Sequence, residues 1–439
     1  MEWLMMLGAG AYLTVRLRFV QFRLLPETLK SLRDSRKKTM ETGAVSPFQA
    51  VCTALAGTMG TGNIAGIAGA VALGGPGAVF WMWMAALLGM ATKYTEVVLA
   101  MRYRQRNAQG EWTGGPMFVI EKGLGRRFRP LAQLFCVFGM LSSLGVGSAA
   151  QVNTLAESAM ALGGTPLRML AGLLAAWTAG SMMRGGMKRM AGAAEKMIPW
   201  VSAVYVTGML CVIAGKLPYV PEVLKMIVVG AFSPQAAGGA LAGMGLRQAL
   251  RVGVARGVFT HEAGMGSSPI AHAGAQTDSP VRQGMLGIFE VFADTIVLCT
   301  LTALGILLSG CHVPYGKDAG AEVTTAALAS VFGMSVSRLL IALCVACYAL
   351  SALAAWSFYG LRCAQYLGGK SVQTVYCAAF VASAFLGAVL DMGFVWQASD
   401  VLNTLMALPN LLAVVCLSGE AAQMTKNHLQ IRKKPEKDA

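Results

Sequence analysis

The chain has 439 residues, of which 55% are hydrophobic and only 13% are charged, and its mean hydropathy is +0.57. Soluble domains carry roughly 25% charged residues, so this composition excludes an ordinary soluble enzyme or binding module. Apolar stretches of about 20 residues, long enough to cross a bilayer, recur along the chain. We therefore predict an all-α polytopic membrane protein with eleven spans. These are 1–15, 48–72, 77–101, 131–160, 167–183, 197–215, 247–271, 284–310, 338–361, 372–390 and 400–418.

The formal net charge of +15 is explained by the position of the basic residues relative to these spans. With the amino terminus outside, most Lys and Arg fall in inner segments, as the positive-inside rule requires. An odd number of spans then places the carboxyl terminus in the cytoplasm. The charge orients the protein in the lipid bilayer and predicts no nucleic-acid partner. The outer side carries only Arg168, Lys216, Lys225, Lys317 and Arg338.

Along the chain, residues 1–45 are expected to form a leading helix followed by a basic amphipathic segment on the cytoplasmic surface. The next span, within 46–72, is interrupted. Ser46-Pro47 is typical of a helix start, because serine caps the helix and proline fits its first position. Three glycines between 57 and 62 then lower helix propensity by about 1 kcal/mol each relative to alanine. Asn63 is suited to cap a second half-helix.

A second interruption is predicted in 247–275, where one half-helix ends near Thr260 and the next begins at Pro269. Backbone leaves the helix at membrane depth only where it is buried in protein or lines a cavity, so both breaks indicate a binding site. Simple glycine-mediated packing of a kinked helix is the alternative. His261 is either an interior histidine or a coupling group. Glu262 is either a partner of the following half-helix or a coupling carboxylate, because a carboxylate within the membrane needs one such role.

The two interrupted spans each open a set of five spans, 46–215 and 247–418, separated by an outer segment, 216–246, and followed by a basic tail, 419–439. An odd number of spans per set inverts the second set relative to the first, as in inverted-repeat transporters.

At each break, one half-helix ends with free carbonyls and the next begins with free amides. Such a pair suits a zwitterion. The amides of Thr61, Gly62 and Asn63 are placed for a carboxylate, and carbonyls in 260–264 for an ammonium group. Carbonyls of Ala56 and Met59, with a hydroxyl from a later span, are suited to a small hard cation such as sodium.

Several runs resemble the alanine or glycine:cation symporter family. They are Gly60-Thr-Gly-Asn-Ile-Ala-Gly66, Gly74-Gly-Pro-Gly-Ala-Val-Phe-Trp-Met-Trp83, Gly89-Met-Ala-Thr-Lys-Tyr-Thr-Glu96 and Glu262-Ala-Gly-Met-Gly-Ser267, with Pro280-Val-Arg-Gln-Gly284 and Asp294-Thr295. The resemblance covers about residues 8–420. It implies a leucine-transporter-type fold, with two inverted five-helix repeats plus one leading helix. It also implies sodium-coupled uptake of alanine or glycine by alternating access across a bacterial inner membrane, without an enzymatic cofactor.

Carried onto this chain, the resemblance implies that the substrate carboxylate meets Thr61, Gly62 and Asn63. It also implies a pocket and a sodium site. The pocket is lined by Gln151, Gly264 and Met265, and Trp356 limits the size of the substrate side chain. The sodium site is formed by Ala56, Met59, the carbonyl of Tyr348 and Ser351.

Three departures from the family pattern bear on coupling. Ala352 stands where a threonine is common, so one hydroxyl ligand of the cation is missing. His261 replaces the usual asparagine beside Glu262 and introduces a titratable group. Leu361 stands where an acidic residue commonly follows Tyr-Gly. A proton-driven or glutamine-preferring transporter, or an amino-acid sensor that does not transport, are therefore the alternatives to a sodium:alanine symporter.

Overall fold

The computed structural model describes residues 2–35, 45–107, 110–232, 245–277 and 279–433. These residues are helical except for loops and one short antiparallel hairpin, in which β1 (Gln105–Arg106) pairs with β2 (Trp112–Thr113). The predicted all-α class is confirmed. Parts of three predicted segments lie outside the described residues: 36–44 of the amphipathic segment, 233–244 of the outer segment and 434–439 of the tail.

The first half of the chain begins with the leading helices α1 (Glu2–Arg16) and α2 (Val20–Ser35) and ends at residue 232. Its other helices are α3 (Pro47–Thr58), η1 (Thr61–Asn63), α4 (Ala65–Gly74), α5 (Gly77–Tyr103), α6 (Pro116–Phe118), η2 (Val119–Leu124), η3 (Arg126–Phe128), α7 (Arg129–Leu144), η4 (Gly145–Ala149), α8 (Ala150–Ala214), η5 (Leu217–Tyr219) and α9 (Val220–Phe232).

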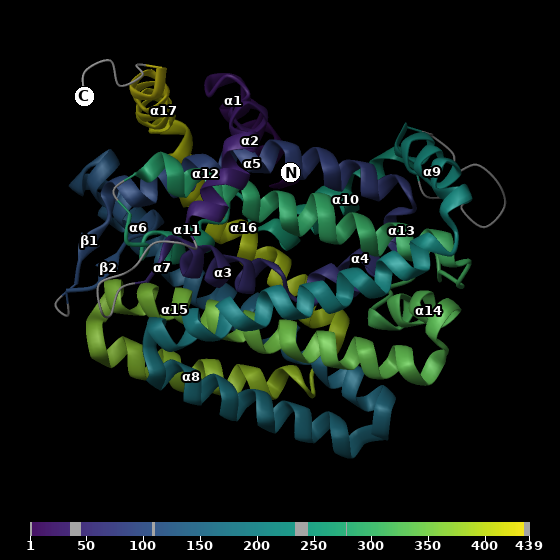
Figure 1. The fold of residues 1–439 in the computed structure, drawn as a ribbon. Helices are drawn as coiled ribbons and strands as arrows, with labels where there is room; N and C mark the ends of the chain where they lie inside the picture. Colours follow the sequence, from purple (N-terminus) through teal and green to yellow (C-terminus); the bar gives the residue numbers. More distant parts are fainter. Residues whose placement is uncertain (1, 36–44, 108–109, 233–244, 278, 434–439) are drawn as a thin grey trace.

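The second half begins with α10 (Leu246–His261) and α11 (Ser268–His272) and ends with α17 (Ser418–Lys433). Between them lie α12 (Pro280–Val291), η7 (Phe292–Cys299), α13 (Thr300–Ser309), α14 (Ala321–Phe332), α15 (Met334–Gly387) and α16 (Met392–Cys416). Figure 1 shows that α3, α4, α10, α13, α8 and α15 run along the same long direction of the molecule.

Six helical stretches of the described residues are long and apolar enough to cross a membrane. Two of them, Arg126–Gly185 and Met334–Gly387, have 60 and 54 residues. Straight helices of that length would span roughly 80–90 Å, against about 30 Å of hydrocarbon. The chain instead turns back, at Gly164 with a φ of +72° and at the non-helical pair Gly368 and Gly369. A single element therefore holds more than one crossing, and the count of eleven stays a prediction.

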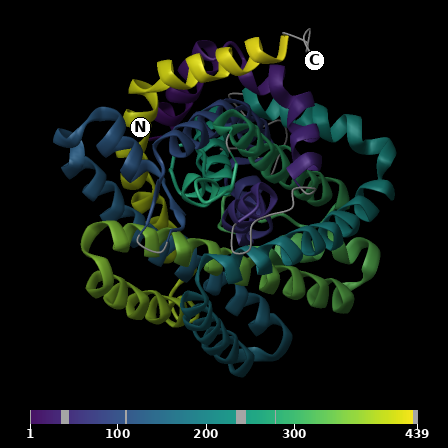
Figure 2. The same cartoon turned by 60° about the vertical axis from the view of Figure 1, so that its left-hand side comes forward.

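The first interrupted helix forms the centre of the molecule, and Figure 2 shows it nearly end-on among the other helices. Its first half, α3, starts as predicted. Ser46 Oγ accepts from Gln49 N at 2.9 Å, the Gln49 side chain accepts from Ser46 N at 3.1 Å, and Pro47 occupies the first turn. This capping box satisfies two amides that the helix itself leaves free. Most of α3 is buried, so both of its faces contact other helices.

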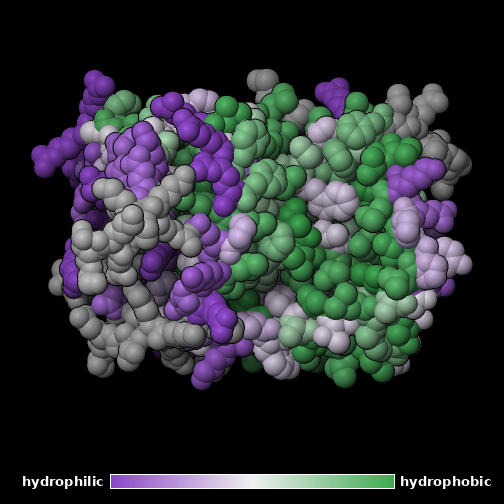
Figure 3. Space-filling model, turned by 45° about the horizontal axis from the view of Figure 1, so that its top comes forward, coloured by the Kyte–Doolittle hydropathy of each residue, from purple (hydrophilic) through white to green (hydrophobic). Residues whose placement is uncertain are grey.

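The outer surface is apolar over a broad central band, and hydrophilic side chains gather towards the end of the molecule that carries β1 and β2 (Figure 3). Large exposed side chains such as Trp177, at 73%, and Leu339, at 65%, belong to long helices. Exposed apolar area on this scale is typical of a surface that faces lipid.

Candidate functional site

The first interruption lies between Thr58, where α3 ends, and Ala65, where α4 begins. Thr61 N and Thr61 Oγ1 both donate to Gln151 Oε1, at 3.0 and 3.1 Å, and Gln151 Nε2 donates to Val146 O at 3.2 Å. A Cβ at Gly60 would lie 2.9 Å from Gln151 Oε1, so only glycine leaves room for this amide. The structure thus brings Thr61 and Gln151 together, 90 residues apart in sequence.

Asn63 lies in the short helix η1, and the first residue to cap α4 is Ile64. The predicted capping role of Asn63 is therefore wrong. Its side chain instead points across to η7, where Asn63 Nδ2 donates to Asp294 Oδ1 at 2.6 Å, and its carbonyl accepts from Thr302 Oγ1 at 3.0 Å. A tertiary partner has taken the side chain that would otherwise bond to the local backbone.

The second interruption follows the predicted limits, because α10 ends at His261 and α11 begins at Ser268. Glu262 adopts a left-handed conformation, with a φ of +53°, which ends α10. Its carboxylate accepts hydrogen bonds from Trp356 Nε1, at 3.0 Å, and from Ser267 Oγ. Trp356, which is fully buried on α15, thus contacts the loop between the two half-helices directly.

The two interruptions contact each other. A Cβ at Gly62 would lie 3.1 Å from the Phe259 ring and 3.5 Å from the Thr260 methyl group. Gly62 therefore permits the backbone of the first break to approach the end of α10. This contact places η1, just before the start of α4, against the end of α10.

The loop between α10 and α11 is held by polar groups from two other helices. Gly264 N and Gly266 N donate to the Glu96 carboxylate, at 3.2 and 3.0 Å, and Asn410 Nδ2 donates to Glu96 Oε1 at 2.5 Å and to Gly264 O at 2.8 Å. Because the amide and the carbonyl of Gly264 are both bonded in this way, α5 and α16 fix the position of the loop. Met265 beside it is fully buried.

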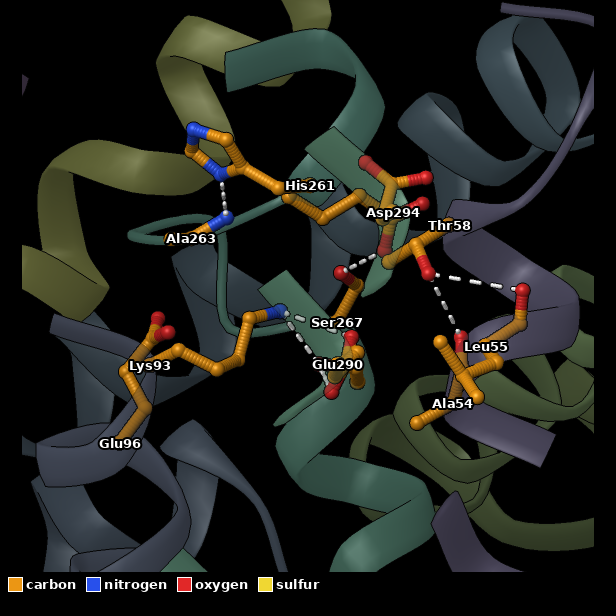
Figure 4. A network of polar contacts seen from close by, with 12 residues as sticks. Ala54, Leu55, Thr58, Lys93, Glu96, His261, Ala263, Ser267, Glu290 and Asp294 are labelled. Atoms are coloured by element: carbon orange, nitrogen blue, oxygen red, sulfur yellow. Dashed lines mark hydrogen bonds and ion pairs between the residues drawn. The ribbon is translucent and has the colours of Figure 1, made fainter. Parts of the chain in front are cut away.

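The spacing of Lys93 and Glu96, three residues apart on α5, predicts an ion pair between them. That prediction is wrong, because Lys93 pairs with another carboxylate. Lys93 Nζ lies 3.2 Å from Glu290 Oε1 on α12 and donates to Ser268 Oγ at 2.5 Å, and both ionic side chains are fully buried (Figure 4). Glu290 Oε2 also lies 3.0 Å from His272 Nε2. This network joins α11 to α5 and α12, which fixes the second half-helix relative to its neighbours.

His261 packs against α5, where a Cβ at Gly89 would lie 2.9 Å from its ring. Its Nδ1 accepts from Ala263 N at 3.0 Å (Figure 4). Since Nδ1 is an acceptor, the neutral ring carries its proton on Nε2, which is buried without a partner.

The residues of the expected sodium site lie where α3 and α15 pack together. Ala56, Met59, Tyr348 and Ser351 are all buried. Ser351 Oγ donates to Tyr348 O at 2.9 Å, and Ser202 joins the two helices by contacting both Tyr348 OH, at 3.0 Å, and Met59 Sδ, at 3.6 Å. Ala352 is fully buried and adds no oxygen.

A cavity of about 640 Å³ lies between α10 and α16, at the end of the molecule where α4 ends. Leu73, Arg256, Phe259, Asp400 and Asn403 are among its lining residues. Phe259 also contacts the first break at Gly62, so this aromatic ring separates the cavity from the two interruptions.

The opposite end is closed by hydrogen bonds. Arg104 donates to the carbonyls of Ala273, Ala275 and Thr277, at 3.3, 2.5 and 2.8 Å. Val45, just before α3, forms a bridge with Ala275. The chain after α11 is thereby bound to the end of α5 and to the start of α3.

Similarity to known proteins agrees with this geometry. The profile of the sodium:alanine symporter family matches residues 1–439. The chain belongs to the sodium:alanine symporter family. It is a membrane transporter and not an enzyme, and the family is one of sodium and amino-acid symporters.

Two relatives cover nearly the whole chain. The "Sodium/alanine symporter AgcS" of Methanococcus maripaludis is 39% identical over 439 residues, covering 99% of this chain and 95% of its own. The "Probable sodium/glutamine symporter GlnT" of Bacillus subtilis is 38% identical over 431 residues, covering 98% and 88%. Among solved structures, MhsT in complex with L-phenylalanine matches with a TM-score of 0.60 at 12% identity, covering 88% of this family member and 99% of MhsT. That likeness confirms the leucine-transporter type of fold.

Sequence reasoning missed the side chains that hold the breaks from outside, above all Asp294, Glu290 and Asn410. The available signal was polarity, because each of them stands within an apolar stretch where an ionic or amide group is costly. Each of them also has a partner between 146 and 314 residues away in sequence, which no local pattern reveals.

Proposed function

We propose that this family member couples sodium entry to the uptake of a small neutral amino acid, chiefly alanine or glycine, by alternating access. The observation that carries the proposal is the contact between the two interruptions, where Gly62 meets Phe259 and Thr260. Two half-helix ends in contact bring backbone amides and carbonyls of opposite polarity outside the regular helical bonding of a buried site, and a zwitterion matches both.

The substrate carboxylate is assigned to the backbone around Thr61, Gly62 and Asn63. Gln151 bonds to Thr61 in the structure and would release that amide, or share it, when a carboxylate arrives. Gly264, Met265 and Trp356 form the opposite side. Because Trp356 is bulky and is bonded to Glu262, it leaves room for a small side chain only.

The coupling cation is assigned to the carbonyls of Ala56, Met59 and Tyr348 and to the hydroxyl of Ser351. Oxygen ligands of this kind suit sodium. A cation there would tie the end of α3 to α15 and so favour the arrangement that binds the amino acid. A proton contribution through His261 and Glu262 is the alternative mode of coupling.

We assign the cavity side to the outside of the cell and the end sealed by Arg104 to the cytoplasm. Arg104 belongs to the basic segment 102–129, which the distribution of Lys and Arg along the chain predicts to lie inside. The amino terminus would then lie outside and the carboxyl terminus inside a bacterial inner membrane.

Uptake of labelled alanine into proteoliposomes tests the proposal. We expect accumulation when sodium is higher outside than inside, little accumulation without the gradient, and competition by unlabelled glycine. A protein that accumulates no alanine or glycine under either a sodium or a proton gradient would refute it. A detergent-solubilised sample that binds alanine while liposomes fail to accumulate it would indicate a sensor.

A second candidate is transport of glutamine, because a relative at 38% identity carries the name of a glutamine symporter. Competition separates the two. If Trp356 limits the pocket to small side chains, a hundredfold excess of glutamine should leave alanine uptake almost unchanged. In a glutamine transporter, the same excess should abolish the uptake of labelled alanine. Replacing the sodium gradient with a proton gradient distinguishes proton-driven uptake in the same assay.

A further inference from the structure

A groove of about 430 Å³ lies between the turn that joins α1 to α2 and one face of α17 (Figures 1 and 2). Its charged lining residues are Arg16, Arg18, Arg23 and Lys426. In the described part of the chain, no acidic residue lines the groove, and none of these four residues belongs to an ion pair. Like charges that converge on one hollow repel one another, so the groove is suited to an anion.

The turn between α1 and α2 has an unusual backbone at the edge of this groove. Arg18 and Phe19 both adopt left-handed conformations, with φ of +54° and +57°. This conformation is costly for any residue that has a side chain. It is held by two backbone hydrogen bonds, from Phe19 N to Thr14 O at 2.7 Å and from Arg23 N to Phe19 O at 3.2 Å. Strain at a basic residue that lines a hollow supports a binding role for that residue.

Both walls of the groove are attached to α5. Gln21, at the start of α2, donates through Nε2 to Leu87 O at 3.1 Å. On the other wall, Tyr94 OH of α5 lies 2.7 Å from Thr425 Oγ1 of α17. Because α5 also carries side chains that hold the second interruption, a ligand that bridges the two walls would steady a helix of the candidate site.

The groove lies at the end of the molecule that we assign to the cytoplasm. Glu420, near the start of α17, accepts from Tyr103 OH at 2.7 Å, and Tyr103 directly precedes Arg104. Next to the basic residues of the turn, Phe19 and Phe22 are more than half exposed. Basic and aromatic side chains together are typical of a segment at the boundary between headgroups and acyl chains. A free phosphate ion would use only the basic residues, whereas a lipid would use both kinds.

We propose that this groove binds the phosphate group of an anionic phospholipid from the inner leaflet. The planar guanidinium groups of its arginines match pairs of phosphate oxygens. A basic segment is attracted to any anionic surface without a groove. The groove adds a defined site, because its lining comes from both ends of the chain, 16–23 and 419–430. The inference goes beyond the proposed symport and does not depend on it.

Thermal unfolding of the purified protein in a neutral detergent, followed by tryptophan fluorescence, tests the site. Phosphatidylglycerol should raise the unfolding temperature, as a ligand of the folded state does. Phosphatidylcholine with the same acyl chains, and inorganic phosphate at the same concentration, should give little protection. The double variant Arg18→Gly with Lys426→Gln removes one charge from each wall, and glycine fits the left-handed backbone. We expect it to need about tenfold or more phosphatidylglycerol for half-maximal protection.

The matched control is Lys30→Gln with Arg33→Gln, which removes two exposed charges from α2 outside the groove. It should keep the wild-type response to phosphatidylglycerol. An equal loss of protection in both double variants would overturn the site, because it would show general attraction to the lipid surface. Equal protection by phosphatidylcholine or by inorganic phosphate would overturn the choice of an anionic lipid. Since unfolding is measured without transport, failure to accumulate alanine would overturn only the proposed function.

Discussion

The indole nitrogen of Trp356 lies 3.0 Å from Glu262 Oε1, which joins α15 to the loop of the second interruption. The two residues are 94 positions apart, and both side chains are buried. The bond fixes the plane of a large ring beside the backbone that we assign to the substrate. In the proposed pocket, the same residue would limit the size of the substrate side chain and hold the loop of the second interruption in place.

Replacing Trp356 with Phe should widen the pocket and leave the Glu262 carboxylate with one donor fewer. We expect uptake of amino acids larger than alanine to become measurable. The unsatisfied buried acceptor should cost about 1–3 kcal/mol of stability. Uptake competition and thermal unfolding in detergent measure the two effects. Trp177→Phe, on a residue that is 73% exposed on α8, controls for loss of an indole as such. If Trp356→Phe and Trp177→Phe had the same substrate range and the same stability, Trp356 would not limit the pocket.

Gly60→Ala should disrupt the first interruption without changing its backbone. Gly60 has extended backbone angles that alanine tolerates, but the added Cβ would lie 2.9 Å from Gln151 Oε1. The glutamine must move away from Thr61. We therefore expect the affinity for the substrate alanine to fall about tenfold, which corresponds to a loss of about 1.4 kcal/mol of binding free energy. Titration calorimetry of the purified protein in detergent measures this affinity.

Gly8→Ala, on α1, is the control for Gly60→Ala, because nothing lies within 4 Å of a Cβ at that position. It should bind alanine with wild-type affinity. If Gly60→Ala also did so, the pairing of Gln151 with Thr61 would have no part in substrate binding.

Both interruptions could be predicted from sequence because their signals are local. The serine and proline that start α3, the glycines of the first break and the Ser268-Pro269 pair at the second all act within one or two helical turns. The observed ends of these half-helices lie within one or two residues of the predicted ones. Helix α3 begins at Pro47, and α10 ends at His261.

The partners of polar side chains could not be predicted in this way. Helical spacing predicts an ion pair between Lys93 and Glu96. Capping preference predicts that the Asn63 side chain bonds to the backbone of α4. In both cases a buried carboxylate on a distant helix, Glu290 or Asp294, provides a better partner in a low-dielectric interior. Local patterns indicate that such a residue needs a partner, and only the fold decides which one it has.

The ion pair between Lys93 and Glu290 should be essential for stability. Both side chains are fully buried, so Lys93→Ala leaves a charged carboxylate with only His272 and Ser268 beside it. Breaking a buried pair typically costs about 3–5 kcal/mol, and we expect a large drop in unfolding temperature in detergent.

The double variant Lys93→Met with Glu290→Gln should recover part of the stability lost in Lys93→Ala, because it removes both charges together. Thermal unfolding followed by tryptophan fluorescence compares the three proteins. A single variant as stable as wild type would show that the pair does not hold α11 in place.

Arg104 should control the end of the molecule that is closed in this structure. Its guanidinium donates to the carbonyls of three alternate residues after α11, Ala273, Ala275 and Thr277, and it stacks 4.0 Å from the centroid of the Trp112 ring. Charge-assisted hydrogen bonds contribute about 1.5–3 kcal/mol each, so Arg104→Ala should shift the population towards states open at this end by tenfold or more. The probe is the rate at which a maleimide labels Cys52, which is 2% exposed on α3, in a variant whose other cysteines are alanine.

Arg106→Ala provides the matched control for Arg104→Ala. Arg106 stacks on the same ring, at 4.9 Å, but its guanidinium donates to Gly110 O, at 3.2 Å, on its own hairpin. Labelling of Cys52 should therefore stay near the wild-type rate in Arg106→Ala and rise in Arg104→Ala, and added alanine with sodium should slow it again in the second variant. If both arginine variants label alike, the hairpin as a whole keeps this end closed, and the three carbonyl bonds of Arg104 have no separate role in alternating access.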